Sequence, residues 1–458
     1  MADDPDRRAN QVVDAEPRLL PDVDVPSLDA YLESGGGEGL LAARERSADE
    51  IIEEVTASGL RGRGGAGFPT GMKWGSIHQA SADPDSTIYA VANAAEGEPG
   101  TYKDRAIMQR NPYLFLEGLL VAMRVVGAER GYVGIKRRFQ AQIGRLVTAL
   151  SEMAAAGWEG ADRVDVATGP DEYLFGEEKA MLETIEGKLP MPRLLPPYQV
   201  GLFAGMTQPN PTLVNNVETL ANVPLILAHG TDWFRSVGTE DSPGTMIFTV
   251  SGDVGAPGLY ELPLGTTLRT LVEDIAQAED VKAIFGGVAQ AVITSEMLDT
   301  PLGWDDMARA GTGLGSGGFV VYDASHCIVR ALASLSHFLM IESCGQCWAC
   351  MLGTDRLTAI LNRIDAGEGA APDLDALFEG ARKVTDQNRC YLPVGEQLMV
   401  LSVLERFGGE VADHLGQPCW SERDPVIPKI ESLDLETGEV QFDPDYARKL
   451  PDWSYAPE

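Results

Sequence analysis

Four of the six cysteines in this chain have a spacing that is typical of iron–sulfur proteins. Cys344, Cys347 and Cys350 form C-x-x-C-x-x-C in "ESCGQCWACMLGT", and Cys390 follows in "NRCYLP". Three thiolates at this spacing on a loop can ligate three corners of a [4Fe–4S] cube, and a distant cysteine can ligate the fourth. Zinc sites more often use two separated C-x-x-C pairs or include histidine. We therefore favour a cluster over a zinc site and over unligated thiols.

Two further cysteines and the hydropathy of the chain bear on its compartment. Cys327 and Cys419 lie outside the four-cysteine set, and we interpret them as small buried core thiols. No stretch approaches the roughly eighteen apolar residues of a membrane span. Residues 1–26 are polar and proline-rich without an apolar h-region, so we expect no signal peptide. These features predict a cytoplasmic chain with no direct membrane insertion, in which disulfides are a poor interpretation of the cysteines.

A glycine-rich segment, "SGLRGRGGAGFPTGMKW", covers residues 58–74. Gly62, Gly64 and Gly67 fit G-x-G-x-x-G, but the preceding residues have helical rather than strand periodicity, which argues against an ordinary Rossmann turn. The net charge of −33 excludes nucleic acid and anionic membrane surfaces as partners. On so acidic a protein, a locally basic loop suits an anionic ligand, and three basic residues lie in or beside this one: Arg61, Arg63 and Lys73.

Three more polar motifs follow predicted strand ends or open predicted helices. Polar side chains just past a strand end are where α/β folds bind ligands. Taken singly, each motif also has a purely structural interpretation, as a solvated turn, as acids that complement a helix dipole, or as an N-cap. The motifs are "VANAAEGEPGTYKDR" with Asn93, Glu96 and Glu98, "EYLFGEEKAMLETIEG" with Gly176 and Glu178, and "TLVNNVETLANVP" with Asn215, Asn216 and Thr219.

Changes in hydrophobic periodicity along the chain divide it into five regions. Residues 1–45 form an N-terminal tail and lead-in, of which about the first 25 are expected to be mobile. Residues 46–240 alternate helix and strand patterns, as an α/β fold does, and residues 241–325 suggest a small β-grasp domain. Residues 326–420 predict a four-helix bundle, and residues 421–458 a C-terminal tail that wraps a surface.

Together, the glycine-rich loop, the three polar motifs and the four cysteines resemble one family over about residues 30–420. It is the flavin-bearing, NADH-oxidising subunit of NADH:quinone oxidoreductase (complex I), and diaphorase subunits of NAD-dependent formate dehydrogenases and hydrogenases are its relatives. The resemblance implies an α/β Rossmann-like FMN/NADH domain, a β-grasp (ubiquitin-like) insert and a helical bundle with a [4Fe–4S] cluster. It implies that NADH gives hydride to FMN and that single electrons leave through the cluster.

The resemblance also implies roles for individual residues. Gly62, Gly64 and Gly65 let the backbone approach the flavin, and Lys73 faces it as a positive charge. Glu98 and Glu178 are the catalytic acids that position NADH. The remaining positions are implied to bind FMN (Asn93, Glu96, Tyr173, Gly176, Asn215, Asn216 and Thr219), to pack on the NADH adenine (Phe68 and Tyr198), or to ligate the cluster (Cys344, Cys347, Cys350 and Cys390).

Three positions depart from the family pattern. Ala95 replaces a flavin-contacting Asp, Ser76 a second aromatic residue that stacks on adenine, and Leu195 a Lys near NADH. An alternative is therefore a non-catalytic electron-transfer or scaffold subunit with a decayed nucleotide site, and another is a diaphorase subunit. With one cluster and no quinone site, the chain is expected to pass electrons to iron–sulfur subunits of a multisubunit redox complex. The resemblance implies that these include a small [2Fe–2S] thioredoxin-like subunit.

Overall fold

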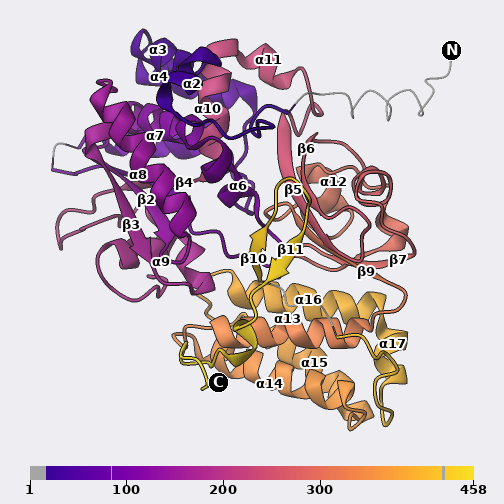
Figure 1. Ribbon diagram of the computed structural model, residues 1–458. Helices are drawn as coiled ribbons and strands as arrows, with labels where there is room; N and C mark the ends of the chain where they lie inside the picture. Colours follow the sequence, from indigo (N-terminus) through magenta and orange to yellow (C-terminus); the bar gives the residue numbers. More distant parts are fainter. Residues whose placement is uncertain (1–16, 84, 425–428, 458) are drawn as a thin grey trace. The chain divides into compact units, whose positions relative to one another are not determined.

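The computed structural model describes residues 17–83, 85–424 and 429–457. They divide into two compact units, which Figure 1 shows coloured along the chain. The first unit comprises the described residues of 1–96, 103–247 and 261–266, and the second those of 97–102, 248–260 and 267–458. Within these described ranges, no helix is both long and apolar enough to cross a membrane.

A parallel four-stranded sheet forms the centre of the first unit, in the order β3-β2-β1-β4. Asn93, near the end of β1, lies in register with Asn216, the last residue of β4. The carboxyl ends of these neighbouring strands therefore present both asparagines at one edge of the sheet. The strands are β1 (Tyr89–Ala94), β2 (Arg130–Lys136), β3 (Val164–Gly169) and β4 (Thr212–Asn216).

Helices surround this sheet, and the most buried of them is α7. Its boundaries follow from its sequence: Asn111 caps the first turn by accepting from Leu114 N, Pro112 occupies N1, and Gly127 ends the helix with a φ of 71°. The helices of the unit are α2 (Leu28–Glu33), α3 (Glu38–Arg44), α4 (Ala48–Ser58), α5 (Thr70–Ala80), α6 (Lys103–Arg110), α7 (Pro112–Val126), α8 (Gln140–Ala155), α9 (Glu178–Ile185), α10 (Val217–His229) and α11 (Thr231–Arg235).

The start of the described chain is packed rather than tail-like. Leu19 is 1% exposed, and its backbone N–H donates to Glu261 Oε2 at 2.8 Å. Helices α2 and α3 follow, and the Tyr31 hydroxyl on α2 donates to the buried Glu117 carboxylate at 2.7 Å. The prediction of a mobile tail is therefore wrong for residues 17–25, because burial and paired backbone groups hold them. Residues 1–16 lie outside the described residues.

A mixed five-stranded sheet follows, in the order β6-β5-β9-β7-β8. Strands β5 and β9 are parallel, whereas β7 is antiparallel to β9 and β8. Between β6 and β7 the chain forms a short helical segment, of which Thr270–Ile275 is a π-helical turn. The strands are β5 (Thr245–Gly252), β6 (Gly258–Pro263), β7 (Val281–Phe285), β8 (Ile293–Thr294) and β9 (Gly318–Asp323), and α12 (Trp304–Arg309) lies between β8 and β9 in the chain.

The rest of the second unit is mainly helical. Helix α13 packs on α14 and α16, and α15 packs on α14 and α16. After the helices, the chain returns along α13, where the Tyr446 ring stacks on Phe338 at 5.2 Å and Lys449 Nζ pairs with Glu342 Oε1 at 2.8 Å. The elements are α13 (Ile328–Glu342), α14 (Trp348–Asp365), α15 (Ala371–Lys383), α16 (Leu392–Arg406), α17 (Gly408–Asp413), β10 (Ile430–Leu433) and β11 (Val440–Phe442).

Candidate functional site

The polar motifs of the first unit meet at the carboxyl edge of the parallel sheet. The glycine-rich loop connects α4 to α5 and lies against the β4–α10 junction: Arg63 N donates to Thr219 Oγ1 at 2.8 Å, and a Cβ on Gly64 would be 3.1 Å from Asn216 Cβ. Asn93 Nδ2, at the end of β1, donates to Gly176 O at 2.7 Å. Segments far apart in the sequence thus form one polar edge, the position at which α/β sheets bind ligands.

A tryptophan that the sequence analysis did not single out fixes Asn215. Trp74 lies on α5, is fully buried, and donates its indole N–H to Asn215 Oδ1 at 2.9 Å. The contact orients the amide so that Nδ2 is its remaining donor group. An amide N–H₂ held in this way suits a ligand with carbonyl or ring-nitrogen acceptors, as a flavin has.

Two predicted site residues form an ion pair. Lys73 Nζ on α5 lies 2.8 Å from Glu178 Oε2 at the start of α9, and their side chains are 29% and 35% exposed. An ion pair that is about one-third exposed contributes little to folding stability. Its partners are therefore available to a ligand at small cost.

Behind the edge lies a buried charged network that the sequence analysis missed. Lys103 Nζ is fully buried between Asp104 Oδ1 at 2.8 Å and Glu218 Oε2 at 2.9 Å. Asp104 Oδ2 in turn accepts from Asn216 Nδ2 at 2.6 Å, so the network holds a predicted ligand residue in place. Glu96, also a predicted ligand residue, belongs to the same region, because its carboxylate accepts from Asp104 N at 2.9 Å and from Arg105 Nε at 2.8 Å.

Burial and the attraction between opposite charges shift the pKa values of these buried groups in opposite directions. Burial raises the pKa of Asp104 to about 6, although the neighbouring Lys103 ammonium opposes the rise. Burial alone would lower the pKa of Lys103, but the charges of Asp104 and Glu218 raise it above its usual range. Lys103 is therefore a permanent buried cation that fixes the carboxylates around it.

The prediction of a locally cationic loop is only partly right. Arg63 is 1% exposed and donates into the interior, to Thr245 O at 3.1 Å, and burial lowers its pKa to about 10. Arg61 Nε donates to Gly67 O at 2.8 Å, which ties the loop to itself. Lys73 is neutralised in part by Glu178. Two of the three charges thus shape the loop rather than offer themselves to a ligand.

The other predicted positions differ in their surroundings. Phe68 and Tyr198 are aromatic and about half exposed, at 52% and 53%. Tyr173 lies in the short turn Tyr173–Gly176 that precedes α9. Glu98 belongs to the second unit, where its carboxylate accepts from Val288 N at 2.8 Å. Ala95 is 1% exposed in an apolar cluster with neighbours such as Phe175, so the missing family carboxylate corresponds to an apolar position here.

The glycine-rich loop leaves room for a flat cofactor. Gly65 has a φ of 121°, which L residues rarely adopt, and a Cβ built on it would meet nothing within 4 Å. The open space lies in the same loop as Gly64, which is next to the side chain of Asn216. Bare backbone, a fixed Asn215 amide and a polar sheet edge together fit an FMN.

The four predicted cluster ligands lie at the junction of α13 and α14 and at the start of α16. Cys344 precedes α14, Cys347 is its N-cap and Cys350 lies inside it, so the prediction of a loop is wrong for the third cysteine. Hydrogen bonds to sulfur include Gln346 Nε2 to Cys344 Sγ at 3.5 Å. Burial raises the pKa of Cys350 to about 11. This is the environment of a ligand that needs a metal to become a thiolate.

The spacing of these sulfurs fits a cluster rather than a single ion. Among the described residues, two groups have three or more candidate ligand atoms mutually within 4.8 Å, and neither contains any of these four cysteines. Ligands of one zinc ion would need such close spacing. A [4Fe–4S] cube is larger and is ligated by four cysteine thiolates, so the chemistry of the donor set fits that group.

Comparisons with known proteins agree with this geometry. Residues 55–225 match a model of the Nuo51 FMN-binding domain, and residues 330–414 match the NADH-ubiquinone oxidoreductase-F iron–sulfur binding region. The chain is 42% identical to an F-type NADH-quinone oxidoreductase subunit of Rhizobium meliloti, over 87% of this chain and 98% of that protein. It is 38% identical to the F-type subunit of Streptomyces coelicolor, over 87% of this chain and 93% of the relative.

A solved structure is also similar. The chain matches a crystal structure of an NAD⁺-reducing [NiFe]-hydrogenase with a TM-score of 0.75 and 33% identity, over 86% of this chain and 67% of that one. Both the sequence and the structural relatives thus cover most of the chain. The chain therefore belongs to the family of F-type NADH:quinone oxidoreductase subunits, whose members carry an FMN-binding domain and a [4Fe–4S]-binding region.

Proposed function

We propose that this chain oxidises NADH within a respiratory NADH:quinone oxidoreductase, with FMN at the carboxyl edge of the parallel sheet and a [4Fe–4S] cluster on the four cysteines. The observation that carries the proposal is the convergence of the glycine-rich loop, Asn93, Asn215 and Asn216 at that one edge. When bound, FMN accepts a hydride and releases electrons singly, and the cluster accepts one electron at a time.

The residues at this edge of the sheet have different roles in binding. Asn215 Nδ2 supplies a fixed donor for a flavin acceptor, because Trp74 occupies Oδ1. Asp104, which pairs with Lys103, accepts from Asn216 and holds it in place. Lys103 keeps its positive charge at neutral pH because its pKa is raised. Phe68 and Tyr198 present rings on which an adenine can stack. Glu178 orients the nicotinamide, and Lys73 holds Glu178 in place until the substrate enters.

We assign the regions of the chain accordingly. Residues 46–240 form the FMN/NADH domain, residues 241–325 a β-grasp insert and residues 326–420 a four-helix bundle for the cluster. The mixed sheet β6-β5-β9-β7-β8 supports the second assignment, and the mutual packing of α13–α16 supports the third. Six cysteines without a disulfide support a cytoplasmic location.

Electrons must leave through a partner, and the surface beside the cysteines suits one. Trp348, Leu352 and Tyr391 are neighbours in sequence of the cluster cysteines and are 75%, 56% and 52% exposed. Trp348 and Leu352 are one helical turn apart on α14, and exposed apolar side chains that lie together mark protein interaction sites. We assign this surface, the Trp348 patch, to an iron–sulfur subunit of the complex.

The test is a measurement on the purified chain in its complex. We expect bound FMN, four irons per chain, and NADH-driven reduction of ferricyanide that disappears when FMN is removed and returns when it is added back. A chain without flavin, or with flavin that NADH cannot reduce, would instead be the non-catalytic subunit.

One observation favours a second candidate. The similarity to the NAD⁺-reducing [NiFe]-hydrogenase covers 86% of this chain, so a diaphorase subunit of a hydrogenase or formate dehydrogenase is the alternative. Identification of the co-purifying subunits separates the two: a quinone-reducing membrane assembly supports the first, and a hydrogenase or formate dehydrogenase subunit supports the second.

A further inference from the structure

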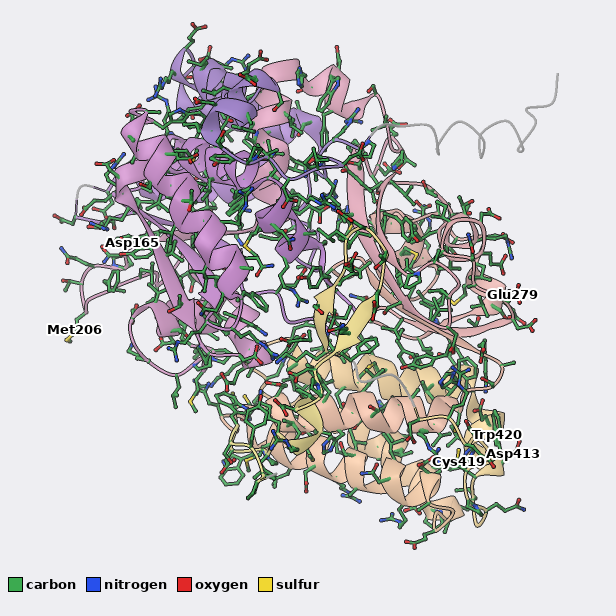
Figure 2. All side chains as sticks on the ribbon, viewed as in Figure 1. Asp165, Met206, Glu279, Asp413, Cys419 and Trp420 are labelled. Carbon is green, nitrogen blue, oxygen red and sulfur yellow. The ribbon has the colours of Figure 1, made fainter. Side chains whose placement is uncertain are left out.

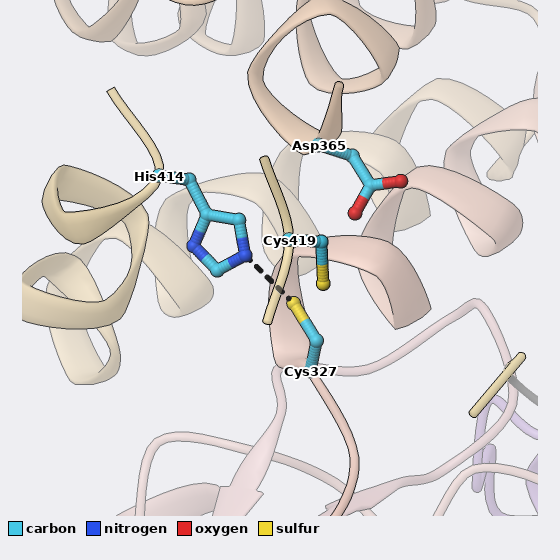
Figure 3. Close-up of side chains that lie close together, drawn as sticks. All are labelled: Cys327, Asp365, His414 and Cys419. Carbon is cyan, nitrogen blue, oxygen red and sulfur yellow. Dashed lines mark hydrogen bonds between the residues drawn. The ribbon is translucent and has the colours of Figure 1, made fainter. Parts of the chain in front are cut away.

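A second group of metal-ligating side chains lies in the second unit, outside the four-cysteine set. Cys327, Asp365, His414 and Cys419 each offer one ligand atom, and these atoms all lie within 4.8 Å of one another. Figure 3 shows the four side chains turned toward a common point. The sequence alone suggested that the two cysteines are core thiols, but core thiols do not require a histidine and a carboxylate beside them.

The four side chains come from separate elements. Cys327 is the N-cap of α13, Asp365 ends α14, and His414 is the C-cap of α17. Cys419 follows α17, and its backbone N–H donates to Asp365 O at 3.1 Å. Figure 2 labels Cys419 beside Asp413 and Trp420 among the C-terminal helices. The group is therefore built by tertiary packing and not by a local motif.

The spacing and chemistry of the ligands match a tetrahedral ion. Zinc bonds of about 2.0–2.3 Å place tetrahedral ligand atoms about 3.3–3.8 Å apart. Cys327 Sγ and His414 Nε2 are 3.2 Å apart, and the whole group lies within the 4.8 Å limit. Two soft thiolates with an imidazole favour zinc over calcium or magnesium, which prefer oxygen ligands.

The histidine is oriented as a metal ligand would be. His414 Nδ1 lies 2.8 Å from Glu410 O, a carbonyl that can only accept, so Nδ1 carries the proton. The lone pair of Nε2 then faces Cys327. A backbone acceptor on the far nitrogen is the usual support for a metal-bound imidazole. His414 and Cys327 are each 2% exposed, so these two ligands are shielded from water, while Asp365 and Cys419 are partly exposed.

The charge of such a site is also balanced. Zinc with two thiolates, one carboxylate and a neutral imidazole has a net charge of about −1. Arg330 Nε lies 3.2 Å from both oxygens of Asp365, and Arg330 Nη1 donates to Ser421 O at 2.9 Å. The guanidinium thus compensates the site and fixes the segment that carries Cys419.

A neighbouring group does not meet the same criteria. Asp253, Asp323 and His326 also lie mutually close, but Arg423 pairs with both of their carboxylates, whereas among the described residues an arginine pairs with only one of the four ligands of the Cys327 group. That group contains no thiolate. The Cys327 group is therefore the better metal site of the two.

We propose that Cys327, Asp365, His414 and Cys419 bind a structural Zn²⁺. Helix α13 has 15 residues between this site and Cys344, so the two metal sites are about 22 Å apart at opposite ends of the α13–α14 pair. Zinc has no accessible second oxidation state and carries no electrons. It joins the ends of α13, α14 and α17 to the segment that follows them.

The experiment is metal analysis of the purified protein by plasma mass spectrometry. We expect one zinc besides the four irons per chain. Cys419→Ser should lose the zinc, keep the irons and keep the rate of NADH oxidation. The matched control is Cys390→Ser, which removes a predicted cluster ligand and should lose iron but keep zinc.

Three results would overturn the proposal. One is wild-type protein that takes up no zinc even after incubation with Zn²⁺. Another is loss of zinc from Cys390→Ser, which would place zinc at the four-cysteine set. The third is a Cys327–Cys419 disulfide in peptide mapping without reductant. If Cys419→Ser does not fold, Co²⁺ added to chelator-treated wild type decides: tetrahedral cobalt–thiolate absorption that Zn²⁺ displaces supports the site, and its absence rejects it.

Discussion

At the scale of single residues, the site depends on contacts between side chains distant in sequence. Trp74 and Asn215 are 141 positions apart, and Lys73 and Glu178 are 105 apart. Sequence motifs identified Asn215, Lys73 and Glu178, because asparagines after a strand and acids at a helix start are visible locally. They could not identify Trp74, whose role exists only once α5 packs against β4. The motifs therefore supplied candidate ligand residues, but not the residues that orient them.

The Lys73–Glu178 pair gives a first prediction. Glu178→Gln keeps a hydrogen-bond acceptor for Lys73 but removes the charge that we assign to orienting the nicotinamide. NADH oxidation should slow about tenfold or more, equivalent to about 1.4 kcal/mol of lost transition-state stabilisation, while FMN content is unchanged. The matched control is Glu183→Gln on the same helix, which should leave the rate near wild type. Parallel loss of flavin and rate would reject the role.

Gly65 gives a second prediction at this scale. Gly65→Val places a branched side chain in the open space of the loop at a φ of 121°. FMN should be lost, and with it NADH-dependent reduction of the cluster, while iron is retained and dithionite still reduces it. Gly157→Val is the control, because Gly157 also has a positive φ, of 74°, and open space around it.

The control separates backbone strain from loss of the cofactor space. Both variants should lose about 1–3 kcal/mol of folding stability from strain, but Gly157→Val should keep its flavin. A wild-type ratio of flavin to iron in Gly65→Val would show that the loop does not cradle FMN.

At the scale of elements, the ends of helices and strands carry the chemistry. β1 and β4 deliver their asparagines in register because both strands are parallel neighbours. Helix α9 begins at Glu178 because the Glu177 carboxylate caps it, accepting from Lys179 N and Ala180 N at 2.9 Å each. The same acid complements the positive end of the helix. The cap therefore sets the position of the residue that we assign to NADH.

This cap predicts a pH dependence of stability. Burial raises the pKa of Glu177 to about 7 from an ordinary value of 4.5. The folded chain then binds this proton more tightly than the unfolded chain, so the free energy of unfolding falls as pH rises from about 4.5 to about 7. Glu177→Gln cannot titrate and should escape that loss.

The measurement is chemical unfolding of wild type and Glu177→Gln at pH 5 and pH 8. Between pH 5 and pH 8, the free energy of unfolding of the variant should rise by about 2 kcal/mol relative to that of wild type. This is less than the full pKa shift of Glu177 implies, because its side chain is 20% exposed. An identical difference at both pH values would contradict the assignment.

At the scale of the whole molecule, the order of elements was largely predictable, whereas sites assembled from distant segments were not. Long periodic stretches predicted the alternation of helices and strands in residues 46–240 and the run of helices in residues 326–420, where α13–α16 lie. A strand as short as β7, "VKAIF", carries no period that could predict it. Cys350 was assigned to a loop because helix α14 begins before its periodic part. The Cys327 group draws on four separate segments, which no spacing rule joins.

The Trp348 patch (Trp348, Leu352 and Tyr391) predicts how the chain joins its complex. Trp348→Glu introduces a charge at the most exposed of its three side chains, at 75%. Binding to the electron-accepting subunit should weaken at least about tenfold, because buried tryptophans carry much of an interface's binding energy. NADH–ferricyanide activity and iron content should not change. Phe378→Glu on α15, 46% exposed, is the control and should bind normally.

The two ligand sets of the second unit are nested in the sequence. Every predicted cluster cysteine, from Cys344 to Cys390, lies between Cys327 and Cys419. Zinc bound to Cys327 and Cys419 would close the chain around the cluster cysteines and reduce the loop-closure entropy that opposes bringing Cys390 to its three partners. The cluster can then still form without zinc, but zinc that binds first would favour its insertion, so a chain starved of iron would keep the ends of its helices joined and ready to be refilled.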